Sequence, residues 1–160
     1  MKNHLIIPLL TGCLLLAGCG QKDQAAASAT TAPAVAFFEF TANDTMKYNL
    51  TRIEVKAGQE VKITLTNTGS MPKAAMAHNW VLLKKGTDGK AFTDTAVTAQ
   101  ATEYIPAALA GQIIVHTKLL GAKQSDEITF KAPAEPGEYP FVCTFPAHFL
   151  SGMQGVMVVK

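Results

Sequence analysis

Four side chains in this sequence have the types and spacing of a soft metal site. Cys143, His148 and Met153 lie within one short segment, CTFPAHFLSGM, and a second imidazole, His78, lies far upstream in AHNW. Thiolate and thioether are soft donors that favour Cu(I), while imidazole suits both oxidation states of copper. A mixed set of this kind holds copper through a one-electron cycle without a strong preference for either state. The residues therefore predict a copper site for electron transfer.

Each of these residues has a simpler explanation when it is taken alone. A single buried cysteine is usually a small apolar core residue, and a single methionine usually fills a gap in a core. The combination is harder to explain in this way, because three of the side chains share one loop that directly precedes a strand-like run, Gly155 to Val159. Zinc stays open as an alternative metal, since thiolate and imidazole also bind Zn²⁺.

The elements that must position these ligands are short strands. Residues 60–66 read EVKITLT, a strict period-two alternation closed by an Asn-Thr-Gly turn signal. Similar short runs, separated by Gly, Pro and Asn, predict an all-β, antiparallel sandwich with further strands over residues 37–40, 53–55, 78–83, 113–116, 127–130, 139–143 and 156–159. The segment from Cys143 to Met153 then joins two strands and carries three ligands, and His78 comes from a neighbouring strand.

One stretch departs from the strand pattern. Residues 94–109 are rich in alanine and weak in strand propensity, and Asp94 or Thr95 has the chemistry of a helix N-cap. Pro106 limits how far a helix can run. We expect a short helix or a flap inserted here.

The first residues have the composition of an export signal. A basic start is followed by an apolar run from Leu5 to Leu16, which is shorter than the roughly 20 residues that span a bilayer. The sequence Leu-Ala-Gly-Cys19 resembles a bacterial lipobox, which implies cleavage before Cys19 and lipid attachment to it; an ordinary secretory signal is the alternative. We expect a signal peptide over residues 1–18, a lipidated cysteine and flexible linker over 19–34, and a single domain over 35–160.

This organisation predicts a location. The protein is expected to be exported and anchored to a membrane, facing the periplasm or the cell exterior. The residue after Cys19 is Gly20 rather than aspartate, which favours the outer membrane in a host with two membranes.

Charge and cysteine count narrow the function further. The formal net charge is only +2 and no basic helix is present, so the electrostatic signature of nucleic-acid binding is missing. Of three cysteines, Cys13 leaves with the signal and Cys19 is acylated, so Cys143 is left as a free thiol in an oxidising compartment. Metal ligation is a direct way to occupy such a thiol.

Three stretches resemble the cupredoxin family of blue copper proteins, its azurins and auracyanins in particular. They are MAHNWVL from Met76, HTKLLG with the later ITF from His116 to Phe130, and CTFPAH from Cys143. The resemblance covers most of residues 37–160. It implies a Greek-key β-sandwich that binds one type 1 copper.

The resemblance also implies a role for each residue of the site. His78 and His148 would bind copper through imidazole nitrogen, Cys143 through its thiolate and Met153 weakly through its thioether. Ala77 stands where azurins have a glycine whose carbonyl approaches copper, so this fifth contact is left open. Four residues separate His148 from Met153, as in auracyanin and plastocyanin, where azurins have three. The two cysteines of the azurin disulfide are absent.

Further residues are expected to support the ligands without binding metal. Asn79 would hydrogen-bond across to the ligand loop, and backbone N–H groups near Phe145 would donate to the Cys143 sulfur. Trp80 is expected in the core, and His116 on the surface rather than at the metal.

The predicted function is a one-electron carrier, not an enzyme. Redox proteins such as cytochromes are the expected partners, docking weakly on an apolar patch near His148 formed with Phe145, Phe149, Leu150 and Met76. A copper enzyme such as a nitrite reductase or an oxidase is one alternative, but its catalytic copper needs extra histidines. A copper-storage module is the other.

Overall fold

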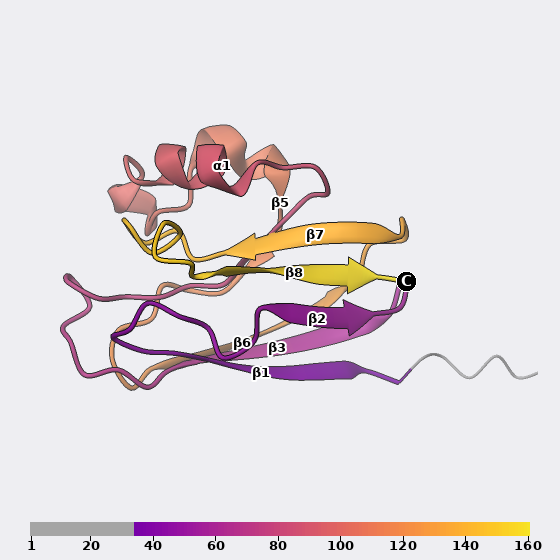
Figure 1. Ribbon diagram of the computed structural model, residues 1–160, viewed down its shortest axis with the longest axis horizontal. Coiled ribbons are helices and arrows are strands. Elements are labelled where there is room, and N and C mark those ends of the chain that lie inside the picture. The colour runs from indigo at the N-terminus through magenta and orange to yellow at the C-terminus, as the bar shows by residue number, and fades with distance from the viewer. Residues whose placement is uncertain (1–33) are drawn as a thin grey trace, which may run out of the picture. The chain divides into compact units, whose positions relative to one another are not determined.

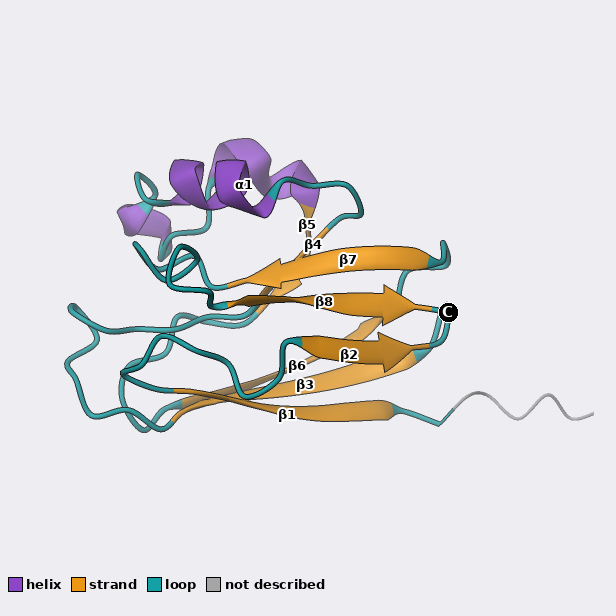
Figure 2. Cartoon of the chain, in the orientation of Figure 1, coloured by secondary structure: helices purple, strands orange, loops and turns teal. Residues whose placement is uncertain are grey.

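Two facing β-sheets form the body of the molecule (Figures 1 and 2). The computed structural model describes residues 34–160. Three strands make one sheet in the order β1-β3-β6, and five make the other in the order β2-β8-β7-β4-β5. The strand bounds are β1 Ala36–Ala42, β2 Arg52–Val55, β3 Glu60–Asn67, β4 Val81–Leu83, β5 Ile113–His116, β6 Ser125–Lys131, β7 Gly137–Val142 and β8 Gln154–Val159.

The predicted Greek-key β-sandwich is confirmed, but not every strand pair is antiparallel. β1 pairs with β3, and β2 with β8, in parallel register. The reason is topological: β1 and β3 belong to one sheet while β2, between them in sequence, belongs to the other. Two reversals of direction bring the chain back to the first sheet running the same way.

The core lies between the sheets and is built from alternating residues. Along β3, Val61, Ile63 and Leu65 are completely buried and the residues between them are partly exposed, as the period-two pattern predicts. Phe40 and Phe141 pack on the fully buried Trp80 with ring centroids 5.6 and 5.3 Å away. Burial of each large apolar side chain contributes about 1.5–3 kcal/mol, so this core supplies the rigid frame for the loops.

The helical insertion starts earlier than the sequence predicted. Helix α1 spans Gly89–Ala96, and the Asp88 side chain caps it by accepting hydrogen bonds from the Lys90 and Ala91 backbone N–H groups. The expected caps, Asp94 and Thr95, therefore lie inside the helix. The cap decided the start, because Asp88 satisfies N–H groups that would otherwise have no partner.

Two 3₁₀ helices complete the insertion, η1 over Gln100–Thr102 and η2 over Ala107–Gln112. Pro106 directly precedes η2. Because proline has no N–H to donate, it lies between the two helices rather than inside one. Phe92 of α1 packs with Leu83 and Val142, which places the insertion on the outer face of the larger sheet (Figure 1).

The two ends of the sandwich are distinct. At one end Ala34 accepts a hydrogen bond from the Gln59 side chain, and Lys160 accepts one from the Ala57 N–H. The loop from β7 to β8 lies at the other end (Figure 1). Within residues 34–160, no helix is long and apolar enough to cross a bilayer.

Gly155 provides a test of how tightly the frame is packed. A Cβ at this position would lie 2.3 Å from the Phe141 ring and 2.4 Å from the Thr51 carbonyl oxygen. We expect Gly155→Ala to lower the free energy of unfolding by about 1–3 kcal/mol through overpacking. Gly111→Ala is the control, because nothing lies within 4 Å of its Cβ. Urea unfolding of the metal-free proteins measures both, and equal stabilities of the two variants would contradict the packing.

Candidate metal centre

The loop of residues 143–153 between β7 and β8, here called the ligand loop, is closed by the end of a β-ladder. Val142 of β7 and Gln154 of β8 form the last antiparallel pair, so Cys143 and Met153 face each other just beyond it. The Cys143 N–H donates to the Met153 carbonyl at 3.1 Å, and the Met153 N–H donates to the His148 carbonyl at 2.9 Å. The backbones of three predicted ligands are thus joined by two hydrogen bonds.

Tight turns shape the rest of the loop. The His148 N–H donates to the Phe145 carbonyl at 3.1 Å, and the Ser151 N–H donates to the Ala147 carbonyl at 3.0 Å. Ala147 and Gly152 have left-handed φ angles of 68° and 90°. At Gly152 a Cβ would also lie 2.6 Å from the Lys47 ammonium, so both the turn and the close approach favour glycine.

His78 reaches the loop from a different part of the sheet. It lies three residues before β4 and forms an isolated antiparallel bridge with Leu120. The His78 N–H donates to the Leu120 carbonyl at 3.0 Å, and the Leu120 N–H donates back at 2.8 Å. The strand predicted over 78–83 is therefore shorter, but the bridge fixes the His78 backbone.

The structure brings three predicted ligands together. One ligand atom each from His78, Cys143 and His148 lie within 4.8 Å of one another, and the Cys143 Sγ is 3.4 Å from the His148 Nδ1. All three residues are at most 1% exposed. Neither ring nitrogen of His78 has a hydrogen-bond partner within the described residues, although buried polar groups normally do. A metal ion would satisfy these atoms, so the side chains present fit a His₂Cys copper site.

Burial sets the charge of the metal-free site. It lowers the pKa values of His78 and His148 to about 4 each and raises the pKa of the Cys143 thiol to about 12. The cause is desolvation, which disfavours the charged form of each group. Copper must therefore displace the thiol proton when it binds, whereas the imidazoles are already neutral.

Asn79 connects the two ligand-bearing segments. Its side-chain Nδ2 donates to the Thr144 Oγ1 at 2.7 Å, and its Oδ1 accepts from the Thr144 N–H at 2.9 Å. The Tyr48 hydroxyl donates to the Asn79 carbonyl. All three residues are buried, so these hydrogen bonds hold the residue after His78 against the residue after Cys143.

The Cys143 sulfur accepts from backbone donors. The N–H groups of Asn79 and Phe145 hydrogen-bond to it, and both oppose the rise in its pKa that burial causes. Donors aimed at a sulfur ligand stabilise negative charge on it. The Asn79 N–H was not anticipated from the sequence, and neither were Tyr48 and Thr144, whose roles depend on long-range contacts that leave no local sequence signal.

Met153 and Ala77 complete the set of predicted ligand positions. Both are completely buried, and Ala77 directly precedes His78. Met153 lies within the same core cluster as Cys143 and Phe145.

The surroundings of His148 differ from the apolar patch that was predicted. Phe145 and Met76 are buried, at 8% and 9% exposure, and the His148 ring is covered. Leu150 is 72% exposed, and the other exposed large apolar residues among residues 34–160 are Val35, Phe37, Met71 and Val97. His116 is exposed at the end of β5, as expected, and does not belong to the cluster.

The fold and this cluster agree with comparisons to known proteins. A family model described as copper binding proteins of the plastocyanin/azurin family matches residues 36–160. The chain therefore belongs to this family, and the resemblance found in the sequence is confirmed. The cofactor is accordingly copper, and the cluster of His78, Cys143 and His148 fits a type 1 site.

Individual relatives support the same conclusion. An azurin from Achromobacter denitrificans is 38% identical over 110 residues, covering 67% of this chain and 73% of that protein. Outer membrane protein H.8 from Neisseria meningitidis is 42% identical over 66% of this chain, which spans only 58% of the H.8 protein. A dithionite-reduced auracyanin from Roseiflexus castenholzii superposes with a TM-score of 0.70 at 36% identity, covering 78% of this chain and 97% of that one.

The buried imidazoles predict how the metal-free protein responds to acid. Their folded pKa values of about 4 lie below the ordinary histidine pKa of 6.5, so the unfolded chain binds more protons between these limits. Stability is then fully present above pH 6.5 and is lost as the pH falls toward 4, with a slope of at most about 1.4 kcal/mol per pH unit for each ring. Urea unfolding of metal-free protein across this range measures the slope.

Two variants identify the source of that slope. His148→Gln should reduce it, while His116→Gln, at an exposed position, should leave it unchanged. An equal slope in all three proteins would contradict the assignment to the buried imidazoles.

Proposed function

We propose that this protein is a one-electron carrier in which His78, Cys143 and His148 would bind copper and Met153 would add a weak contact through its thioether. The observation that carries the proposal is the buried cluster, in which a thiol and two imidazoles converge and neither His78 nitrogen has a hydrogen-bond partner in the described part of the chain. Copper held in this way supplies a reversible one-electron couple. The family is one of electron-transfer proteins, which supports a carrier rather than an enzyme.

The chain's own residues would keep the site nearly unchanged as the electron enters and leaves. The ladder end fixes Cys143 and Met153, the Leu120 bridge fixes His78, and Asn79 joins the two segments. Low polarity around the ligands excludes water, while the Asn79 and Phe145 N–H groups moderate the charge on the sulfur. The Ala77 carbonyl is a candidate fifth contact, because Ala77 is buried beside His78.

Partner proteins would dock at the end of the domain that carries the ligand loop. The exposed Leu150 belongs to this loop, two residues after His148, and Val97 lies just beyond α1. A small apolar contact of this kind suits partners that bind weakly and release quickly, such as cytochromes.

The alternatives to an electron carrier are separated by the side chains of the site or by its redox behaviour and spectrum. A catalytic copper needs additional histidines, whereas His116 is exposed and outside the cluster. A storage module would bind the metal without rapid electron exchange, so reversible reduction by a cytochrome separates carrier from store. Zinc would give a colourless protein, and an absorption spectrum decides between the two metals.

We further propose that the domain is tethered to a membrane through lipid on Cys19. Residues 1–33 lie outside the described structure, so the signal peptide (1–18) and linker (19–34) rest on the lipobox-like sequence. The similarity to a protein named outer membrane protein H.8 supports this location. The described domain begins at the end opposite the ligand loop, which would leave that loop free to meet partners (Figure 1).

Substitution of the proposed ligands tests the carrier function. The copper-loaded protein should show an intense visible band that bleaches on reduction and returns on oxidation. Cys143→Ser should abolish the band by removing the thiolate. Met153→Leu should retain it and shift the reduction potential, because the thioether is a weak axial ligand. Colour retained in the serine variant would defeat the ligand assignment.

Removal of Cys19 tests the tether. Full-length protein expressed in a bacterium should fractionate with membranes and carry a mass increase on the peptide that begins at Cys19. Cys19→Ala should abolish that mass increase and prevent lipoprotein processing. Firm anchoring takes two acyl signals, so mature protein without lipid should not stay bound to vesicles. Vesicle binding by that lipid-free form would contradict the proposal.

A further inference from the structure

The helical insertion makes a strained corner immediately beside the metal centre. Glu103 and Tyr104, which follow η1, have successive left-handed φ angles of 54° and 63°. Such conformations are uncommon for residues other than glycine and persist only where the surroundings enforce them. A left-handed residue often ends a helix, but η1 needs only one. The second therefore points to a contact that the corner has to make.

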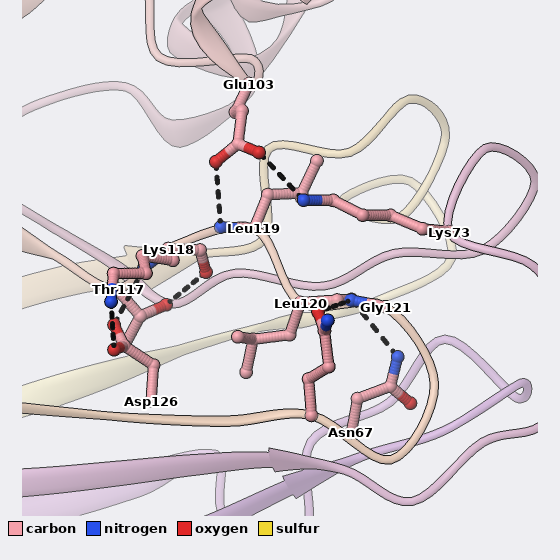
Figure 3. A network of polar contacts seen from close by, with 10 residues as sticks. Asn67, Lys73, Glu103, Thr117, Lys118, Leu119, Leu120, Gly121 and Asp126 are labelled. Carbon is pink, nitrogen blue, oxygen red and sulfur yellow. Dashed lines mark hydrogen bonds and ion pairs between the residues drawn. The ribbon is translucent and has the colours of Figure 1, made fainter.

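The Glu103 side chain contacts the segment that holds His78. Its carboxylate accepts a hydrogen bond from the Lys73 ammonium at 2.7 Å and a longer one from the Leu119 N–H at 3.4 Å (Figure 3). The next residue, Leu120, forms both backbone hydrogen bonds of the His78 bridge. Glu103 thus contacts Leu119, the residue directly before the one whose hydrogen bonds fix the His78 backbone.

The Tyr104 side chain contacts the segment that holds His148. Its ring meets the Phe145 ring edge to face, with centroids 5.3 Å apart and planes at 70°. Phe145 in turn packs on the His148 imidazole, with centroids 4.8 Å apart. A single aromatic ring therefore separates Tyr104 from the proposed ligand His148.

We propose that the Glu103–Tyr104 corner is a positioning device that holds His78 and His148 in register from outside the site. The proposal rests on the ligand assignment made above. Backbone hydrogen bonds fix the main chain at both histidines, and the Phe145 ring packs on the His148 imidazole. By bracing Leu119 with one side chain and Phe145 with the next, the corner couples the segment bridged to His78 with the loop that carries His148.

This gives the insertion a function that its sequence does not show. Supports of this kind act through the ligands they orient, and their loss typically weakens metal binding by about 10–100-fold. The effect on the metal should depend on the aromatic ring of Tyr104 rather than on its hydroxyl, since the contact with Phe145 is between rings.

The experiment compares Tyr104→Ala with Tyr104→Phe. In the metal-free protein, the His148 ring resonances should shift and broaden in Tyr104→Ala and stay unchanged in Tyr104→Phe. In the copper-loaded protein, the alanine variant should show altered electron paramagnetic resonance parameters and an affinity for Cu(II) about tenfold lower in competition with a chelator. If the alanine variant does not fold, Tyr104→Leu replaces it with the same expected changes.

Glu103 has a matched control at another ion pair. Lys85–Glu135 joins a 44% exposed lysine to an exposed glutamate, as Lys73–Glu103 does, but it involves none of the ligand-bearing segments. Glu103→Ala should move the His78 resonances, and Glu135→Ala should not.

The outcomes separate this proposal from the proposed function. Unchanged His148 resonances and copper spectrum in a folded Tyr104→Ala or Tyr104→Leu protein would overturn the positioning role, even if stability fell. A wild-type protein without a reversible visible band would instead overturn the carrier assignment, and the metal-free measurements would still decide the role of the corner.

Discussion

The structure depends on the burial of three side chains, the proposed copper ligands, that protein hydrogen bonds leave poorly satisfied. A thiol and two imidazoles lie in the core with at most 1% exposure, and among residues 34–160 neither nitrogen of His78 has a hydrogen-bond partner. Burial of polar groups without partners is costly, and here it also keeps all three groups uncharged. Such a site persists because the surrounding sandwich enforces it. Copper would then bind side chains that are already in place and shielded from water.

Three kinds of contact enforce the arrangement, and they come from different levels of the fold. The ladder end between β7 and β8 sets the loop that carries three ligands, and the bridge to Leu120 sets His78. Buried hydrogen bonds between Asn79 and Thr144 then lock these parts together. An electron carrier benefits from these overlapping contacts, because any movement that the ligands must make when the metal gains or loses an electron slows the transfer. The same rigidity leaves only a small apolar exposure, such as Leu150, for brief encounters with partners.

Local chemistry made much of this predictable from the sequence. Strict alternation over residues 60–66 identified β3, and the donor types at Cys143, His148 and His78 predicted side chains that the structure brings together and that fit the copper of the family. The helix start was wrong by five residues or more, because the cap formed by Asp88 competed with those expected at Asp94 and Thr95. The parallel pairing of β1 with β3 and of β2 with β8 was not predicted, because it depends on which sheet β2 joins. Tyr48, Thr144 and the Glu103–Tyr104 corner act through distant contacts, which one sequence does not reveal.

The central claim is that the protein, and not the oxidation state of the metal, sets the geometry of the site. X-ray absorption spectroscopy of the copper-loaded protein in its oxidised and reduced forms tests this most directly. We expect one sulfur and two imidazole nitrogens in the inner shell of both forms, with nearly the same distances. Loss of a ligand or gain of a water on reduction would contradict the account.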